Sequence, residues 1–337
     1  MVNDKRNNKG LISVQLLRGI AALLVITYHI SVKAEQRGLA DSHYFSIGSC
    51  GVDLFFVISG FIMCYTTTST TTCKKFVQSR ITRVFPPYWI LTTIALVVYL
   101  VKPSLVNASG GTTSILASYI LLPSGDKFLV QNGWTLSYEM VFYLFYAFSL
   151  CFFPNLKNLV VTVMLSGVFI FGLVFNTSSN PYLLFLFNDL FLEFLLGIIA
   201  YEIFVRTKLS LTSSLIVLML SITMLIFMNG QSSGYRVVFF GIPMFLLFLS
   251  VINLENYFST KNKLSFLGDI SYSLYLVHPF ILSPLALVLA YVGVTNNLVF
   301  FIILMSFSIL ASYIFYKQIE YPVTNKIKQL TQKYSFT

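Results

Sequence analysis

Ten separate stretches of this chain are apolar and long enough to cross a bilayer, and this repetition restricts the chain to one kind of fold. A helix that crosses the hydrocarbon core needs about 20 mostly apolar residues. The sequence predicts such helices at 11–32, 51–68, 84–102, 134–153, 158–175, 182–204, 211–228, 236–253, 272–292 and 298–318. The chain is 56% hydrophobic and only 10% charged, whereas a soluble domain is about 25% charged. We therefore expect an all-α integral membrane protein, a bundle of about ten transmembrane helices.

The domain organisation follows from these segments. The charged start of the chain looks like the beginning of a signal peptide, but the apolar run behind it lacks a small-residue cleavage site, so it is expected to stay as a spanning helix. The stretch 112–123 is too short to cross and is expected at the interface or as a re-entrant piece. The prediction is a tail over 1–10, one polytopic membrane domain over 11–320 and a second tail over 321–337.

The distribution of lysine and arginine predicts the orientation. With the N-terminus inside, sixteen of these residues fall in cytoplasmic segments, one lies within a helix, and five lie outside: Lys33, Arg37, Lys102, Lys127 and Arg236. Cytoplasmic loops of membrane proteins carry the excess of positive charge. Both termini are therefore expected in the cytoplasm, and the formal net charge of +10 does not indicate a nucleic-acid partner.

The four cysteines carry no recognisable pattern. They form no C-x-x-C pair, no metal-ligand spacing and no disulfide framework. Cys64 and Cys151 lie in apolar segments, where each thiol is expected to be a small packing group.

The first predicted helix contains two ionisable residues, Arg18 and His29. Eleven residues separate them, which is about 16 Å along a helix and three turns plus about 20° around it, so they share one face. An ionisable group at membrane depth is costly unless it is paired or wetted, and it usually marks a functional cavity. The alternative is that Arg18 extends to the inner interface and His29 only makes a helix contact.

Two carboxylates are expected near His29, because all three residues fall in the outer halves of their helices. Asp53 lies in the first turn of the second helix, and Glu139 lies about five residues inside the fourth. A carboxylate that orients a histidine is the usual arrangement for general-base catalysis near neutral pH. The alternatives are a helix cap for Asp53 and a structural hydrogen bond for Glu139. Trp134 could contact an acceptor or anchor the interface.

A basic segment, CKKFVQSRITRVFPPYWI, precedes the third predicted helix. Arg80 and Arg83 share a face if the segment is helical, and with Lys74 and Lys75 they suit a phosphorylated cytoplasmic ligand such as coenzyme A. The alternative is positive charge next to anionic lipid. Pro86–Pro87 is expected to begin the third helix, where a missing N–H does no harm.

Other candidates give weaker signals. His278 could contact a donor or only form a hydrogen bond between helices, and Glu193 has no obvious partner. The sequence contains no P-loop, no dinucleotide fingerprint and no metal-ligand cluster. We therefore expect no metal and no permanently bound cofactor.

Five of these segments, in this order, resemble membrane acyltransferase family 3. They are LRGIAALLVITYHI, GVDLFFVISGFIM, RITRVFPPYW, WTLSYEMVFYLFY and ISYSLYLVHPF. They carry the family's basic residue and histidine (Arg18, His29), its R-x-x-R element (Arg80, Arg83) and its W-[ST]-L-x-x-E element (Trp134, Glu139). The resemblance extends over about residues 11 to 320. Met140 follows Glu139 where relatives often have a second carboxylate, which puts the role of Glu139 in doubt.

The resemblance implies an O-acyltransferase of the bacterial cytoplasmic membrane that modifies a surface or exported glycan, such as a lipopolysaccharide. Acetyl-CoA would be the cytoplasmic donor, bound at its phosphates by Arg80 and Arg83. His29 would be the general base, Asp53 or Glu139 would orient it, and Arg18 would guide the donor or stabilise charge. Direct transfer and an acyl-enzyme both stay open, as do the sugar, the acyl group and the oligomeric state. The alternatives are a transporter or flippase of a lipid-linked glycan without acyl-transfer chemistry, and an inactive relative that assists export.

Overall fold

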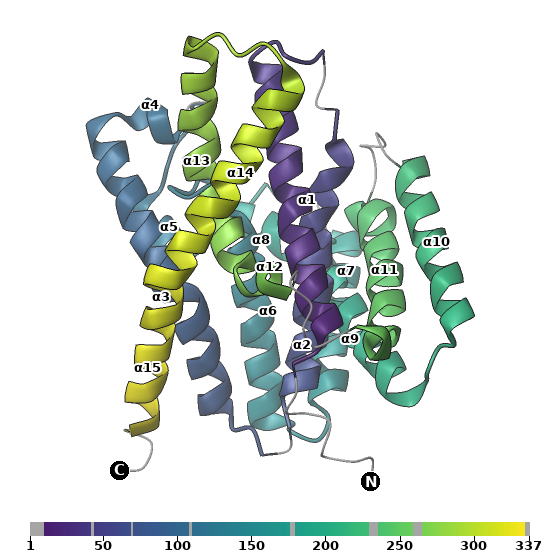
Figure 1. Cartoon of the computed structure of the whole chain (residues 1–337). Helices are drawn as coiled ribbons and strands as arrows, with labels where there is room; N and C mark the ends of the chain where they lie inside the picture. Colours follow the sequence, from purple (N-terminus) through teal and green to yellow (C-terminus); the bar gives the residue numbers. More distant parts are fainter. Residues whose placement is uncertain are drawn as a thin grey trace. The chain divides into compact units, whose positions relative to one another are not determined.

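All ten predicted segments form helices in the computed structural model of the chain (Figure 1). The structure describes residues 10–41, 44–68, 70–107, 110–175, 179–228, 235–258 and 265–333, so residues 1–9 of the predicted N-terminal tail lie outside it. Among the described residues, nine helices are long and apolar enough to cross a membrane. The segment predicted at 236–253 is a shorter apolar helix over Val237–Asn253. The chain is therefore a multi-pass membrane protein.

The chain divides into two units, and each has its own packing. Unit 1 contains Met1–Thr68, Asp189–Tyr272 and Leu282–Phe307, and unit 2 contains Ser69–Asn188, Ser273–Ile281 and Ser308–Thr337. Two late helices, α13 (Ser271–Tyr291) and α14 (Asn297–Phe315), contribute residues to both.

Unit 1 is built around α2 (Gly51–Thr66), which contacts α1 (Ile12–Gln36), α9 (Phe191–Arg206) and α11 (Ile242–Asn253). Its other elements are short or peripheral: the 3₁₀ turns η2 (Ser46–Cys50) and η4 (Glu255–Tyr257), the π-helical turn η3 (Val237–Gly241), α12 (Ser265–Asp269), and α10 (Leu211–Met228), which lies beside α11 in Figure 1. Of the residues of α2, thirteen of sixteen are buried. This explains why GVDLFFVISGFIM is apolar on every face.

Two glycines allow α2 and α9 to approach closely. A Cβ atom built on Gly60 would lie 2.1 Å from the carbonyl oxygen of Phe194, and one built on Gly197 would lie 2.2 Å from that of Val57. Small residues at helix crossings let backbones touch in membrane proteins, where lipid supplies no hydrophobic force between helices. The glycines therefore set the separation of α2 and α9.

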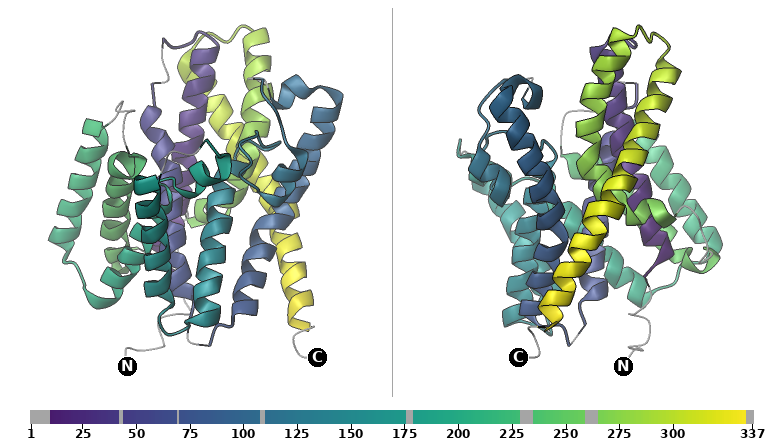
Figure 2. Two further views of the ribbon diagram at one scale, coloured as in Figure 1. Left: turned by 180° about the vertical axis from the view of Figure 1, so that it is seen from behind. Right: turned by 60° about the vertical axis from the view of Figure 1, so that its left-hand side comes forward.

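Unit 2 is built around α3 (Cys73–Val101), which packs against α6 (Gly133–Phe152) and α15 (Tyr321–Lys333). Figure 2 shows α15 running along α3. The remaining elements are α4 (Pro103–Val106), α5 (Ile115–Ile120), α7 (Lys157–Phe175), α8 (Pro181–Leu186) and the π-helical turn η5 (Tyr316–Glu320). The predicted short piece at 112–123 contains α5, and the predicted span 182–204 is interrupted between α8 and α9.

The predicted start of the third helix is wrong. The sequence placed it at Pro86–Pro87, but α3 begins at Cys73 and runs through both prolines. Thr72 caps the helix by accepting a hydrogen bond from the backbone nitrogen of Lys75 at 3.3 Å. Prolines inside a membrane helix are tolerated where neighbouring groups satisfy the freed carbonyls. As a result, Arg80 and Arg83 lie within a helix and share a face, as the i, i+3 spacing requires.

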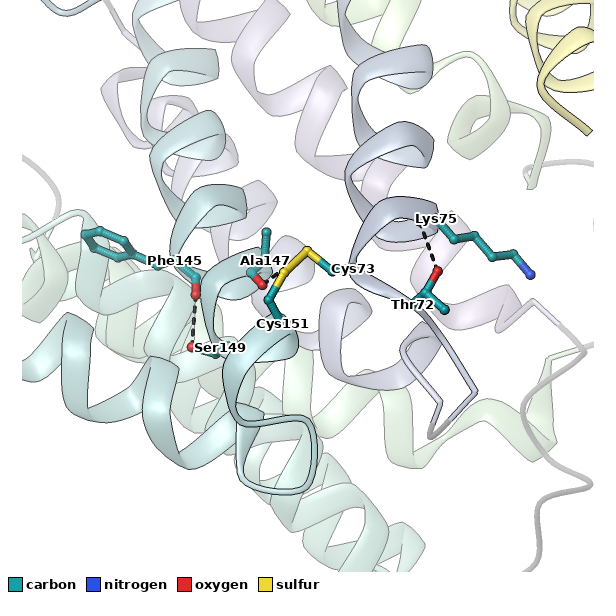
Figure 3. Close-up of a disulfide and its surroundings, with 7 residues drawn as sticks. All are labelled: Thr72, Cys73, Lys75, Phe145, Ala147, Ser149 and Cys151. Atoms are coloured by element: carbon teal, nitrogen blue, oxygen red, sulfur yellow. Dashed lines mark hydrogen bonds between the residues drawn. A yellow bond between two sulfur atoms is a disulfide. The ribbon is translucent and has the colours of Figure 1, made fainter. Parts of the chain in front are cut away.

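The expectation for the cysteines is also wrong for one pair. Cys73 and Cys151 form a disulfide, with Cα atoms 5.3 Å apart and a sequence separation of 78 positions (Figure 3). The bond joins the start of α3 to the end of α6. No spacing rule could reveal this pairing, because it depends on the antiparallel packing of two distant helices. Cys50 and Cys64 form no disulfide within the described part of the chain and are buried, which agrees with a packing role for Cys64.

Candidate active site

Arg80 projects into the packing between α3 and α6 of unit 2. Its guanidinium carbon lies 5.7 Å from the ring centre of Phe76 and 5.8 Å from that of Tyr143. Its Nε donates to Ser79 Oγ at 3.2 Å, while its Nη1 is buried and makes no hydrogen bond with any described residue. A buried donor without an acceptor is costly and is rare in folded proteins. Arg80 therefore offers a binding position for an anionic group.

The carboxylate of Glu139 belongs to the same cluster. The Tyr143 hydroxyl donates a hydrogen bond to Glu139 Oε1 from the next turn of α6. Glu139 also interacts electrostatically with Arg80, and Tyr143 with both Arg80 and Arg83. The structure thus brings together the R-x-x-R pair and the glutamate that the sequence assigned to separate roles. We call Arg80, Arg83, Glu139 and Tyr143 the arginine–glutamate cluster.

The other predicted residues of unit 2 lie around this cluster at different depths. Lys74 and Lys75 are exposed in the first turn of α3, about two turns before Arg80. Trp134 is 40% exposed near the start of α6, and its ring meets that of Tyr138 edge-on at 6.0 Å. An exposed tryptophan of this kind can stack on a sugar or anchor the interface.

The late signature segment contributes a polar contact to α6. Within unit 2, the Tyr275 hydroxyl forms a hydrogen bond with Thr135 Oγ1, and the Tyr275 carbonyl accepts one from Asn132 Nδ2. His278 is buried, and its Nδ1 lies 2.9 Å from the carbonyl oxygen of Leu274. Because a carbonyl can only accept, we assign the proton to Nδ1 of His278. This contact is within one helix, so it supports neither a donor role for His278 nor a bond to another helix.

In unit 1, α1 is helical over the whole interval from Arg18 to His29, so the two side chains share a face as predicted. Both are half-buried. Arg18 Nη1 lies 3.4 Å from Gln15 Oε1, and the His29 ring meets that of Tyr28 edge-on at 5.1 Å.

Asp53 is fully buried and is held by an arginine. Arg236 donates two hydrogen bonds to it, from Nε at 2.9 Å and from Nη2 at 2.6 Å, and a third to the carbonyl oxygen of Ser49 at 2.9 Å. Such a two-pronged pair is the strongest geometry that arginine and a carboxylate adopt. Gly51 lies against Ala21 of α1, and α2 runs antiparallel to α1. Asp53 and His29 therefore lie on opposite sides of this level, about 15 Å apart along the axis. The structure does not place Asp53 beside His29, as the sequence analysis expected, and a catalytic role for Asp53 stays a prediction.

Glu193, for which the sequence suggested no partner, lies in the same part of unit 1. It is fully buried and interacts electrostatically with Asp53, Arg236 and Asp189. Asp189 accepts a hydrogen bond from the backbone nitrogen of Val237 at 3.0 Å, at the start of η3. No group of three or more metal-ligand side chains occurs in the described part of the chain.

Two residues of these clusters were missed by the sequence analysis. Tyr143 follows Glu139 by four positions, which places them on one face of a helix, so this spacing could have indicated it. Arg236 was assigned only to an outer loop, and nothing in the sequence points to its pairing with Asp53 across 183 positions.

The arginine–glutamate cluster combines two cations, one carboxylate and a buried unsatisfied donor. It can bind an anion such as a phosphate, which arginine forks recognise well. The imidazole of His29, half-buried on α1, offers a ring nitrogen that can accept a proton.

Comparison with known proteins finds a matching family and several relatives. The model of an acyltransferase domain family matches residues 11–317. The chain is 32% identical over 267 residues to the exopolysaccharide production protein ExoZ of Rhizobium meliloti (strain 1021), covering 75% of this chain and 81% of ExoZ. It is 30% identical over 139 residues to the acyltransferase MdmB of Streptomyces mycarofaciens, covering 38% and 36% of the two chains. It is 26% identical over 274 residues to ORF330 of Acidianus two-tailed virus, covering 78% and 80%. No solved structure matches the chain.

Proposed function

Since this chain belongs to membrane acyltransferase family 3, we propose that it transfers an acetyl group from cytoplasmic acetyl-CoA to a hydroxyl of a surface or exported glycan. The buried, unsatisfied Nη1 of Arg80 is the observation that carries the donor part of the proposal. A phosphate oxygen of the donor would supply the missing acceptor. Arg83 would bind a second phosphate oxygen, and the exposed Lys74 and Lys75 would attract the anion.

The acceptor class is proposed from the chemistry of sugars and from one relative. ExoZ, by its name, takes part in exopolysaccharide production. Trp134 offers an exposed aromatic face of the kind that sugar rings stack on. We propose a bacterial cytoplasmic membrane as the location, where a lipid-linked glycan would be the acceptor.

The proposed reaction needs one base and no cofactor. His29 accepts the proton of the acceptor hydroxyl, and the oxygen attacks the thioester carbonyl. The C–S bond breaks, and the coenzyme A thiolate takes the proton back from His29. General-base catalysis by a positioned histidine contributes about 10²–10⁴-fold to such a rate. Arg18 would guide the donor, since about 16 Å of helix separates it from His29.

The test uses membranes that contain the intact protein or His29→Gln, which keeps a polar side chain but cannot act as the base. Acetyl-labelled acetyl-CoA and extracted host glycolipid are supplied, and label in the glycan fraction is followed. We expect transfer with the intact protein and a loss of at least 100-fold with the variant at equal protein levels.

The other outcomes distinguish acyl transfer through His29 from the alternative functions. Equal label with both proteins would remove His29 from the chemistry. Export of glycan by the intact protein, without label and without release of coenzyme A, would favour the transporter or flippase.

Arg80 has its own expected result. Arg80→Gln removes a charge-assisted hydrogen bond, worth on the order of 1.5–3 kcal/mol, so the KM for acetyl-CoA should rise about tenfold to 100-fold. Arg206→Gln is the matched control, because Arg206 is exposed and pairs with Glu202 one turn away. A KM that rises equally in both variants would contradict a donor site at Arg80.

A further inference from the structure

Tyr143 contacts both the carboxylate of Glu139 and the guanidinium of Arg80 in the arginine–glutamate cluster. The sequence motifs give it no role. It is buried, donates its hydroxyl hydrogen to Glu139, and interacts with the guanidinium of Arg80. We infer that Tyr143 is a positioning residue for the acyl donor and that it acts through Glu139. The inference rests on the proposed function, because it assigns the donor to Arg80.

The argument begins with the hydrogen-bond capacity of the hydroxyl. A tyrosine hydroxyl has one hydrogen to donate, and here it is committed to the Glu139 carboxylate. The bond spans one turn of α6, so both ends are fixed to the same rigid helix. The hydroxyl therefore holds Oε1 of the carboxylate toward Tyr143.

The direction of the carboxylate decides whether Arg80 is available. Arg80 Nη1 is buried and makes no hydrogen bond with the described residues, although a carboxylate is part of the same cluster. A carboxylate released from Tyr143 would gain energy by turning to this donor, because opposite charges attract strongly away from bulk water. The resulting ion pair would occupy the position that we assign to a donor phosphate. Tyr143 thus keeps Glu139 from competing with the acyl donor.

A neighbouring tyrosine provides a comparison that separates this role from packing. Tyr146 is fully buried one turn further along α6, and its ring stacks on Phe76 at 5.3 Å. Its hydroxyl lies 3.2 Å from Asn158 Oδ1, so it does not donate to Glu139. Tyr143→Phe and Tyr146→Phe therefore remove the same atom from the same helix, but only the first releases Glu139.

The experiment measures binding of radiolabelled acetyl-CoA to the purified full-length protein in detergent, so that it does not depend on turnover. Tyr143→Phe should bind about tenfold more weakly than the intact protein, since a hydrogen bond to a charged group is lost and a competing anion is gained. Tyr146→Phe should bind normally. In the Glu139→Gln background, Tyr143→Phe should have no further effect, because no carboxylate is left to release.

Steady-state measurements provide a second readout. Tyr143→Phe should raise the KM for acetyl-CoA by the same factor and leave kcat and the KM for the glycan nearly unchanged. A structural defect would instead lower the amount of active protein and reduce kcat in both tyrosine variants.

The results that contradict the inference differ from those that contradict the proposed function. An intact protein that does not bind acetyl-CoA refutes the proposed donor, and the inference with it. An intact protein that binds acetyl-CoA, with Tyr143→Phe binding equally well or losing the same factor in the Glu139→Gln background, refutes the inference alone.

Discussion

The pair of Asp53 and Arg236 is the best-defined ionic contact in unit 1. Asp53 is fully buried, and the Arg236 side chain is 31% exposed. Breaking a buried pair by removing one partner costs more than the pair contributes, because it leaves a buried charge without compensation. We expect Asp53→Asn to lower the free energy of unfolding by about 2–4 kcal/mol, less than for a fully buried pair since water reaches Arg236.

The measurement is the thermal unfolding midpoint of the purified protein in detergent. Glu202→Gln is the control, because it removes the acidic partner of an exposed i, i+4 pair with Arg206 at 2.8 Å. Such surface pairs contribute about 0.3–0.5 kcal/mol, so the midpoint should hardly move. Equal midpoints for Asp53→Asn and the intact protein would show that this ion pair does not stabilise unit 1.

For single residues, the sequence could identify the ionisable side chains that matter but not most of their partners. Arg18, His29, Asp53 and Glu139 were predicted to matter because charge inside a membrane segment is costly. Their contacts depend on which helices pack together, and a single sequence contains no information on contacts between Asp53 and a residue 183 positions away. Tyr143 was missed, although its partner Glu139 lies four positions away on the same helix and the spacing could have indicated it.

Among the elements, the crossing of α2 and α9 makes a sharp prediction. Gly197→Ala would place a Cβ atom 2.2 Å from the Val57 carbonyl oxygen and 2.8 Å from the Phe61 nitrogen, so the helices would have to separate. Overpacking of this kind costs about 1–3 kcal/mol or more. We expect a lower unfolding midpoint and a lower yield of folded protein in detergent.

Gly167 provides the matched control for this substitution. It lies in α7, another membrane helix, and an added Cβ would have no atom within 4 Å. Gly167→Ala should be neutral or slightly stabilising, since alanine favours helix more than glycine does. A Gly197→Ala variant as stable as Gly167→Ala would show that the α2–α9 separation can adjust.

The elements themselves were predictable from hydrophobic runs, because each membrane helix must bury its backbone polar groups within itself. The boundaries of two of these helices could not be predicted. The sequence placed Pro86–Pro87 at the start of a helix, but α3 begins 13 residues earlier at Cys73. The first turns of α3 are mostly polar, but they have one apolar side, which packs against α6. The run at 182–204 hid a break between Leu186 and Phe191, since the two polar residues of the break, Asn188 and Asp189, stand between long apolar runs.

For the whole molecule, the predicted orientation and the disulfide lead to a joint test. The excess of lysine and arginine predicts that the segment before α3, and with it Cys73, faces the cytoplasm. Disulfides are rare in that compartment, and those that occur are usually transient. Cys73 is only partly buried and Cys151 is exposed, so reductants can reach the bond. We therefore expect the two cysteines to be thiols in living cells and to form the bond after isolation in air.

The test counts the cysteines that were oxidised in the cell. Cells are quenched with acid, and free thiols are blocked with N-ethylmaleimide. The protein is then reduced and labelled with a polyethylene-glycol maleimide. The expected result is no mass shift from quenched cells and a shift of two labels from protein purified without reductant. Cys151→Ser should abolish the mass shift of the purified protein. Cys64→Ser, which removes a buried thiol outside the disulfide, should leave that shift intact. Two labels from quenched cells would mean that this end of unit 2 faces an oxidising compartment. The orientation predicted from charge would then be reversed, and a cytoplasmic donor could no longer reach Arg80 from the end of α3 that carries Lys74 and Lys75.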